Sequence, residues 1–257
     1  MNIHIDAIGH GPDLVMLHGW GLDSRVFEPL VDRLARRHRL HLVDLPGYGH
    51  SRDVDTPPSM ADLTDDLAKL IPSGAAWLGW SLGAQIALLV AQRSPAHIGR
   101  LILVAGTPCF VARAGWPAAM TPEVFGEFAD GLQKDWRGTL TRFIGLLAAD
   151  PRSDRDMLRS LRDRLISRAE PSPVALASGL ESLRDNDLRL SLPALRTETL
   201  LIQGDRDRLV PPAAATAVSS LLPAARVVMI PGAGHAPFLS HPDAFLAHLE
   251  SFLVEAA

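Results

Sequence analysis

Ser81, Asp207 and His235 are residues of the three types that together cleave esters, and they occur in that order along the chain. A serine hydroxyl is a poor nucleophile at neutral pH, so a base has to take its proton during the attack. Imidazole has an unperturbed pKa of about 6.5, which makes His235 the candidate base. A buried carboxylate has to fix the tautomer of that base and stabilise its charged form, and Asp207 is the candidate. These residue types predict acyl transfer through a serine nucleophile.

Ser81 lies in the pentapeptide Gly79-Trp80-Ser81-Leu82-Gly83, between two apolar runs. We expect a strand before the serine, a helix after it and a sharp turn that exposes Oγ. Such a turn strains the serine backbone, and glycines two residues before and after it remove Cβ atoms that would collide. The helix that starts at Leu82 directs its free N–H groups toward the position of an oxyanion. The alternative is a glycine-rich turn with a solvated serine.

Two other acids compete with Asp207. Asp205 lies in the same loop, but the Gly-x-x-Asp-x-x-Val-Pro spacing from Gly204 favours Asp207. Asp44 precedes the serine, which is the wrong chain order for this arrangement, so we expect it to tie its own loop.

The other histidines lack the loop context of His235. We expect His18 to orient the loop that it begins, and the rest to lie on the surface or in packing: His4, His10, His38, His41, His50, His97, His241 and His248. No histidine pair has metal-ligand spacing on one helix and there is no His/Cys cluster, so we predict no metal site. No Walker loop or GxGxxG motif occurs, and we predict no cofactor.

Apolar runs alternate with helical patterns along most of the chain. We expect strands at residues 1–8, 14–17, 40–43, 101–104, 199–202 and 227–230, and a short one that begins at Ala75 and leads into the Ser81 turn. Helical spacing predicts helices at 25–37, 60–71 and 241–254, one from Leu82 and an alanine-rich one after Pro211. This alternation predicts an α/β fold with a mostly parallel sheet and helices on both faces.

The alternation is interrupted between residues 104 and 199. Residues 111–192 have helical spacing with frequent glycine and proline breaks. We expect them to form a helical cap inserted into a core of residues 1–110 and 193–257. Such an insertion, at the carboxyl ends of the strands, would lie over the loops that carry the three candidate residues.

The composition narrows the class of protein. The chain has 257 residues, of which 47% are hydrophobic, enough for one sizeable core. The net charge is −4, and positive and negative residues are interspersed along the chain, which argues against nucleic acid as a partner. The single cysteine, Cys109, excludes an internal disulfide and fits a reducing compartment. Without a signal sequence or an apolar run of about 18 residues, we expect a cytoplasmic monomer that spans no membrane.

At this level of detail the sequence resembles an α/β-hydrolase, and within that superfamily the pimeloyl-acyl carrier protein methyl ester carboxylesterases of biotin synthesis. The stretches that carry the resemblance are His18-Gly19-Trp20-Gly21-Leu22, His41-Leu42-Val43-Asp44-Leu45-Pro46-Gly47-Tyr48-Gly49, Trp77-Leu78-Gly79-Trp80-Ser81-Leu82-Gly83, Pro108-Cys109-Phe110 and His235-Ala236-Pro237-Phe238-Leu239-Ser240-His241-Pro242. The resemblance spans the chain and is weakest in the cap.

The resemblance implies hydrolysis of the methyl ester of pimeloyl-acyl carrier protein to methanol and pimeloyl-acyl carrier protein. It implies that the backbone N–H groups of Trp20 and Leu82 are the oxyanion donors; the His-Gly loop itself points to Trp20. It also implies that a cap segment contacts the substrate, namely Phe143, Ile144, Gly145, Leu146 and Leu147.

The family binds its carrier protein through cap arginines, which implies Arg142, Arg155 and Arg159 here. Arg152, Arg155, Arg159 and Arg162 fall on one helical face beside Leu158, Leu161 and Leu165. A merely solvated face is the alternative, because Asp154, Asp156 and Asp163 dilute the charge. The sequence departs from the family at Gly138, where an arginine is expected and Arg137 stands beside it, and at Ala84, where glycine is more usual.

Two other functions stay open at this point. A general carboxylesterase for short free acyl esters would use the same three residues without needing a carrier protein. A ligand receptor that keeps the fold but barely turns over would fail to react with a covalent serine probe.

Overall fold

The computed structural model describes residues 3–54, 56–148, 155, 156, 158, 159, 161 and 170–254. Its centre is a seven-stranded sheet with the strand order β1-β3-β2-β4-β5-β6-β7. The strands are β1 (His4–Gly9), β2 (Asp13–Leu17), β3 (Arg39–Asp44), β4 (Ala75–Trp80), β5 (Ile98–Val104), β6 (Thr199–Gly204) and β7 (Ala225–Ile230). β1 pairs with β3 in antiparallel fashion, and the other pairings of this sheet are parallel.

The predicted strands are confirmed, within a few residues at their ends. Residues 14–17 of β2 and all of β6 are buried. This agrees with their apolar runs, since strands that are covered on both faces are rich in consecutive apolar residues. The first predicted strand is observed from His4 to Gly9, and Met1 and Asn2 lie outside the described residues.

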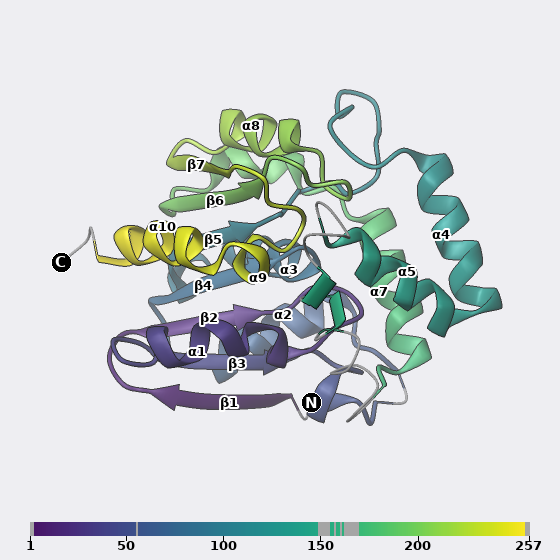
Figure 1. The fold of residues 1–257 in the computed structure, drawn as a ribbon. Helices are drawn as coiled ribbons and strands as arrows, with labels where there is room; N and C mark the ends of the chain where they lie inside the picture. The colour runs from purple at the N-terminus through teal and green to yellow at the C-terminus, as the bar shows by residue number, and fades with distance from the viewer. Residues whose placement is uncertain are drawn as a thin grey trace.

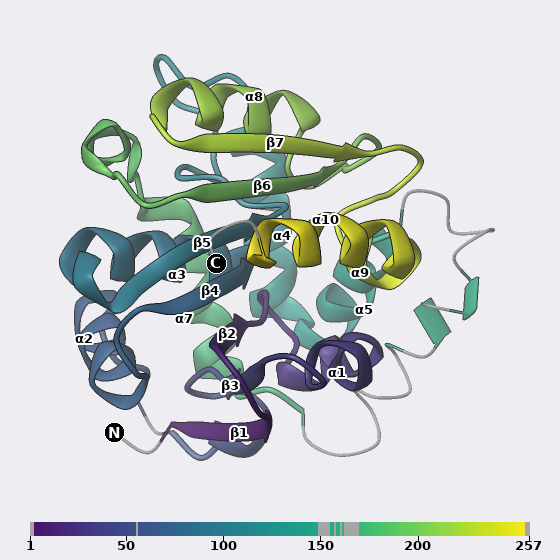
Figure 2. The same cartoon turned by 90° about the vertical axis from the view of Figure 1, so that its left-hand side faces the viewer.

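Helices cover both faces of the sheet, as expected. α1 (Glu28–Leu34), α9 (Pro237–Ser240) and α10 (Pro242–Val254) lie on one face, whereas α2 (Met60–Leu70), α3 (Leu82–Arg93) and α8 (Pro212–Leu221) lie on the other (Figure 1 and Figure 2). The predicted helix over 25–37 is wrong in extent. It is a 3₁₀ turn, Ser24–Phe27, followed by the short α1, since Pro29 cannot donate an N–H within a helix and sits in the first turn of α1.

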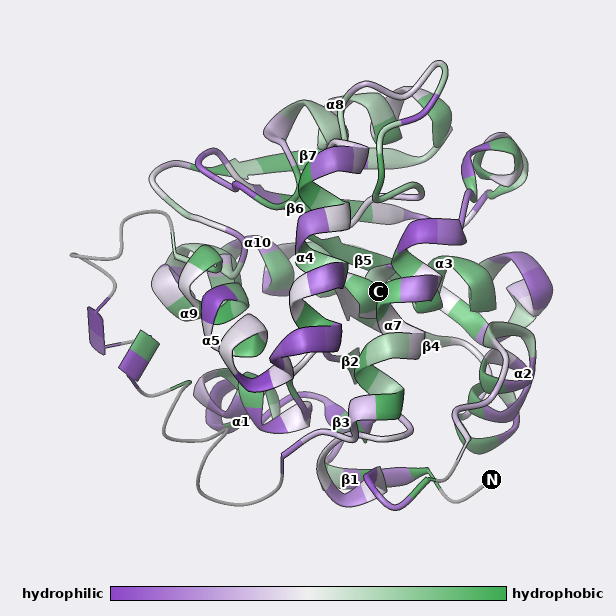
Figure 3. Cartoon of the chain, turned by 90° about the vertical axis from the view of Figure 1, so that its right-hand side faces the viewer, coloured by the Kyte–Doolittle hydropathy of each residue, from purple (hydrophilic) through white to green (hydrophobic). Residues whose placement is uncertain are grey.

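Three described helices connect β5 to β6: α4 (Pro122–Lys134), α5 (Trp136–Leu146) and α7 (Pro173–Asp185). They lie at the carboxyl ends of the parallel strands (Figure 1), and the view onto that end has them in front of the sheet, with hydrophilic residues on α4 and α5 (Figure 3). All three helices fall within the predicted cap of residues 111–192, and the division into this cap and a core of residues 1–110 and 193–257 stays a prediction. Within the described part of the chain, no helix combines the length and apolarity needed to cross a membrane.

Candidate active site

Ser81 occupies the turn between β4 and α3 with a strained backbone. Its φ is 55° and its ψ is −112°, a left-handed conformation that residues other than glycine rarely adopt. A Cβ on Gly79 would lie 2.3 Å from the carbonyl oxygen of Gly83, and a Cβ on Gly83 would lie 2.3 Å from that of Leu17. The two glycines are therefore required by close backbone approach on both sides of the serine.

Asp207 and His235 meet in a buried hydrogen bond. The distance from His235 Nδ1 to Asp207 Oδ2 is 2.8 Å, and both side chains are fully buried. The carboxylate also accepts hydrogen bonds from the N–H groups of Leu209 (2.8 Å) and Val210 (3.0 Å) and from the side-chain amide of Gln203 (2.8 Å). These donors hold the carboxylate in one orientation, so Nδ1 carries the proton and Nε2 keeps its lone pair.

The two rival acids have structural partners instead. Asp205 is exposed and accepts from the N–H of Gly232 at 2.7 Å. Asp44 is buried and accepts from the N–H groups of Ser24 (2.9 Å) and His50 (2.8 Å). Burial pushes the pKa of Asp44 upward, but hydrogen bonds from Ser24 and His50 outweigh this and hold the pKa below its ordinary value.

The peptide of His235 is held from two sides. Its carbonyl accepts from the indole N–H of Trp80 at 2.8 Å, which brings His235 beside the residue that precedes Ser81. Its own N–H donates to the carbonyl of Leu147, at the end of α5, at 3.1 Å. Among the described residues, His235 Nε2 has no hydrogen-bond partner, and no hydrogen bond joins it to the Ser81 hydroxyl.

The two expected oxyanion donors lie in adjoining segments. Trp20 follows β2 and Leu82 follows β4, and these strands pair in parallel with Leu17 opposite Gly79. Leu82 is the first residue of α3, where N–H groups have no partner within the helix. Neither the Trp20 nor the Leu82 N–H donates to another described backbone carbonyl. Both groups are therefore available to a substrate oxygen.

His18 orients the loop that carries Trp20. It is completely buried, its Nε2 accepts from the N–H of Leu45 at 3.0 Å, and its Nδ1 donates to the Gly19 carbonyl at 2.8 Å. Burial lowers the pKa of His18. The neutral imidazole thus links the loops after β2 and β3.

The cap reaches the core loops through Trp20. The indole N–H of Trp20 donates to the Leu176 carbonyl of α7 at 2.8 Å. The same ring packs edge-on against Phe143 of α5 (5.0 Å between centroids) and Phe128 of α4 (5.4 Å). In the predicted substrate segment, Phe143, Ile144 and Leu147 are buried, whereas Gly145 and Leu146 are half-buried.

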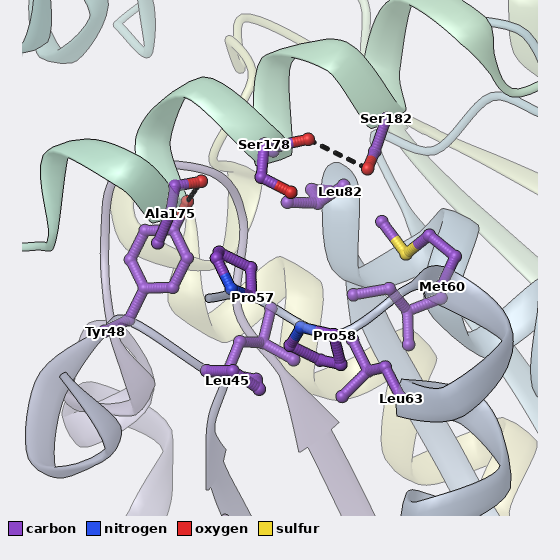
Figure 4. Close-up of a pocket in the computed structure, with 13 residues that line it drawn as sticks. Leu45, Tyr48, Pro57, Pro58, Met60, Leu63, Leu82, Ala175, Ser178 and Ser182 are labelled. Atoms are coloured by element: carbon purple, nitrogen blue, oxygen red, sulfur yellow. Dashed lines mark hydrogen bonds between the residues drawn. The ribbon is translucent and has the colours of Figure 1, made fainter. Parts of the chain in front are cut away.

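A pocket that sequence reasoning missed lies between α7 and α2, next to Leu82 (Figure 4). It contains about 370 Å³ of empty space, part of it open to solvent, and is lined mainly by apolar side chains such as Leu45 and Met60. Tyr48 and Ser178 add hydroxyl groups to its wall. The prolines at 46, 57 and 58 were its only sequence signal, because they mark a long irregular segment between β3 and α2.

The predicted carrier-binding arginines are all exposed. Arg142 lies on α5, where its guanidinium donates to the Thr139 hydroxyl at 2.9 Å. Arg155 and Arg159 are exposed, and Leu158 and Leu161 beside them are buried. Arg152, Arg162 and Leu165 lie outside the described residues.

Arg137, beside the departure at Gly138, is engaged within the cap. Its guanidinium pairs with Glu170 at 2.6 Å and stacks 4.3 Å from the ring of Trp136. A Cβ at position 138 would lie 2.1 Å from a carboxylate oxygen of Asp135, which caps the start of α5. Glycine at this position therefore accommodates the capping aspartate.

Comparison with known proteins agrees with this architecture. The model of the alpha/beta hydrolase family matches residues 14–248, and the chain belongs to that family. The solved structure of an esterase from Exiguobacterium antarcticum is 26% identical, with a TM-score of 0.88 over 97% of this chain and 94% of that chain.

Within the family, this chain belongs with the pimeloyl-acyl carrier protein methyl ester esterases. A protein of that name from Xanthomonas oryzae pv. oryzae is 48% identical over 251 residues, which cover 98% of each chain. Another from Stenotrophomonas maltophilia is 46% identical, covering 98% of this chain and 96% of the relative.

Proposed function

We propose that this protein hydrolyses the methyl ester of pimeloyl-acyl carrier protein, releasing methanol and pimeloyl-acyl carrier protein, as a step in biotin synthesis. Ser81, Asp207 and His235 are the catalytic residues. The observation that carries the chemistry is the buried hydrogen bond between the side chains of Asp207 and His235, 2.8 Å long. The backbone carbonyl of His235 is in turn bound by the indole of Trp80, next to the strained Ser81 turn. The relatives at 46–48% identity carry the substrate assignment.

The first half of the reaction forms an acyl-enzyme. Ser81 Oγ attacks the ester carbonyl carbon while His235 Nε2 accepts the hydroxyl proton. The carbonyl oxygen becomes an oxyanion, which accepts hydrogen bonds from the N–H groups of Trp20 and Leu82. The carbon–methoxy bond then breaks, and His235 returns the proton to the leaving oxygen, so methanol departs.

Water completes the reaction by the same route. His235 takes a proton from the water as its oxygen attacks the acyl-enzyme carbonyl. The second tetrahedral intermediate collapses, the bond to Ser81 Oγ breaks, and the serine recovers its proton. The free carboxylate of the pimeloyl group is the product, and Asp207 stabilises the imidazolium in both halves.

The cap supplies the binding surfaces in this proposal. Residues 143–147 line the substrate path beside His235, as the Leu147–His235 contact supports. The apolar pocket next to Leu82 suits an aliphatic chain near the oxyanion position. Arg142, Arg155 and Arg159 present exposed positive charge to an acidic carrier protein and to the phosphate of its prosthetic arm.

We further propose a cytoplasmic monomer. The free, buried Cys109 suits a reducing compartment such as the cytoplasm, where this protein would encounter its carrier-bound substrate. Size-exclusion chromatography with light scattering tests the monomer, and a mass near twice 27.7 kDa would contradict it.

The deciding experiment compares three substrates: the methyl ester on acyl carrier protein, the same free methyl ester and a short aryl ester. The Ser81→Ala variant serves as the blank, and Ser220→Ala, an exposed serine on α8, serves as the matched control. We expect kcat/KM on the carrier-bound ester to be at least about tenfold higher, or about 1.4 kcal/mol in transition-state binding.

Equal or better turnover of the free esters would identify a general carboxylesterase and reject the carrier requirement. Activity retained by Ser81→Ala on every substrate would reject the serine mechanism itself.

A further inference from the structure

A second cluster of reactive side chains lies on the edge of the sheet, away from the proposed active site. His4 and Asp6 lie two residues apart on β1 and therefore point to the same face. His50 lies in the 3₁₀ turn Gly49–Ser51 that follows β3. One ligand atom from each of the three side chains lies within 4.8 Å of the others.

Backbone contacts hold the two elements of this cluster together. The N–H of His4 donates to the hydroxyl of Ser51 at 2.8 Å, and His4 lies opposite Asp44 in the β1–β3 pairing. The rings of His4 and His50 are 4.5 Å apart between centroids, with 40° between their planes. His50 thus joins His4 and Asp6 because the fold fixes the turn after β3 beside β1, and not because it is near them in sequence.

The contacts inside the cluster fit a shared cation better than they fit hydrogen bonding. His4 Nε2 lies 3.1 Å from Asp6 Oδ1, yet this nitrogen is shielded from solvent and makes no hydrogen bond with any described group. Two ligand atoms that bind one Zn²⁺ at about 2.0–2.2 Å each lie roughly 3–3.5 Å apart in tetrahedral geometry. The His4–Asp6 separation is therefore already close to that of two ligands on one metal.

Asp44 provides the supporting contact that metal-binding histidines usually have. Its Oδ2 accepts from the N–H of His50 and lies 3.2 Å from His50 Nδ1. Its Oδ1 is fixed by the N–H of Ser24. A histidine that donates Nδ1–H to a carboxylate keeps the Nε2 lone pair for a metal, and its ring is held in orientation.

We propose that His4, Asp6 and His50 form a binding site for a divalent transition metal such as Zn²⁺, with water as a further ligand. Two imidazoles and one carboxylate favour Zn²⁺, Co²⁺, Ni²⁺ or Cu²⁺ over Mg²⁺ and Ca²⁺. The side chains of Asp6 and His50 are 51% and 67% exposed, so an ion can reach these two ligands from solution, whereas His4 Nε2 is shielded.

The metal would act on structure and not on the ester chemistry. β3 and β2 separate β1 from β4, the strand that leads to Ser81. A bound ion would clamp the antiparallel edge strand to the turn after β3, so metal binding stabilises this edge. The prediction of no metal site rested on the spacing of histidines along single helices and on the lack of a His/Cys cluster in the sequence. Neither criterion tests residues that the sheet brings together.

Calorimetric titration of the metal-free protein with Zn²⁺ tests the site. We expect saturable binding of one ion per chain, a higher thermal midpoint with Zn²⁺, and affinity at least about tenfold weaker in His4→Ala and in His50→Ala. The matched control is His248→Ala, which removes an exposed histidine of α10 and should bind as the wild type does.

Co²⁺ substitution gives a second readout, because Co²⁺ bound in a four-coordinate site has intense visible d–d absorption bands, which the variants should lose. No saturable binding, or equal binding by wild type and both variants, would overturn the proposal. Esterase activity should not change with the metal or with His4→Ala, so a failed titration leaves the proposed catalytic function untouched.

Discussion

The core loops and the cap place their functional groups in different ways. Ser81, Asp207 and His235 each follow a strand of one sheet, and backbone contacts of 3 Å or so fix each position. The cap residues lie on helices with exposed faces; Arg142, for example, is exposed and donates to Thr139 on its own helix. In the proposed function, the chemistry therefore depends on a rigid frame, whereas substrate choice depends on a surface that tolerates change.

The sharpest test of the core is a pair of neighbouring acids. Asp207→Asn should lower kcat by about 10⁴-fold, because an amide beside Nδ1 no longer fixes the tautomer or stabilises the imidazolium. Asp205→Asn, two residues away and exposed, should keep nearly full activity. Steady-state kinetics on a short aryl ester measures both.

Equal losses in the two variants would mean that the loop, and not the hydrogen bond to His235, is what the reaction needs. A larger loss at Asp205 would reverse the assignment of the acid.

Trp20 tests the junction between core and cap. Trp20→Ala should destabilise the protein by about 3–5 kcal/mol, since it removes a buried ring that packs on Phe143 and Phe128. Trp20→Phe keeps a ring but loses the hydrogen bond to the Leu176 carbonyl, which should cost about 1 kcal/mol. Urea unfolding of the two variants gives both values. Identical stabilities would show that the ring contacts contribute nothing.

The cap arginines test the surface. Reversing Arg142, Arg155 and Arg159 together to glutamate should raise KM for the carrier-bound ester by about tenfold and leave the free methyl ester unchanged, because exposed charge pairs contribute about 0.2–1 kcal/mol each. Added salt should weaken the wild type in the same direction.

Arg36→Glu is the matched control, because Arg36 is exposed and precedes β3, at the amino-terminal ends of the parallel strands, whereas the cap lies at their carboxyl ends (Figure 1). An equal effect of this variant would reduce the result to net charge.

The smallest expected effect is a pH dependence from His18. Burial depresses the pKa of His18 in the folded protein below its value of 6.5, so the unfolded chain binds more protons as the pH falls below 6.5. Stability is therefore fully present above pH 6.5 and is lost as the pH falls toward the folded pKa, with a slope of at most about 1.4 kcal/mol per pH unit.

Denaturant unfolding at pH values from 7 to 5 measures this slope. The slope should be shallower in His18→Gln than in the control His248→Gln, where the side chain is exposed. His38, whose pKa burial also lowers, should keep part of the dependence. Parallel slopes in both variants would contradict the assignment.

The sequence predicted the core well because its signals have strict physical causes. Only glycine fits at positions 79 and 83, where a Cβ would meet a carbonyl oxygen at 2.3 Å. Buried parallel strands read as apolar runs, and the sheet followed from them. The helix predicted over residues 25–37 contains Pro29, which sits in the first turn of the shorter α1.

Other features had no signal to find. Leu147 contacts His235 through its backbone carbonyl, which every residue type has, so the residue type gives no signal for this hydrogen bond. The bond depends on where α5 ends. The pocket beside Leu82 forms between four separate segments, which lie within residues 45–48, 57–63, 82–86 and 175–182. His4 and His50 are far apart in the chain and meet only through the β1–β3 pairing. Exposed arginines on an amphipathic helix look the same whether or not a partner binds them.

The two hydrogen bonds to the His235 peptide set a limit on how such proteins can be recombined. One comes from Trp80 in the core and the other runs to Leu147 in the cap. In a chimera whose cap comes from a relative, the backbone at the end of α5 would follow the conformation of the relative's cap. The junction must keep a backbone carbonyl at the position of Leu147. Otherwise His235, the proposed base, loses one of these two hydrogen bonds even though every proposed catalytic side chain is still present.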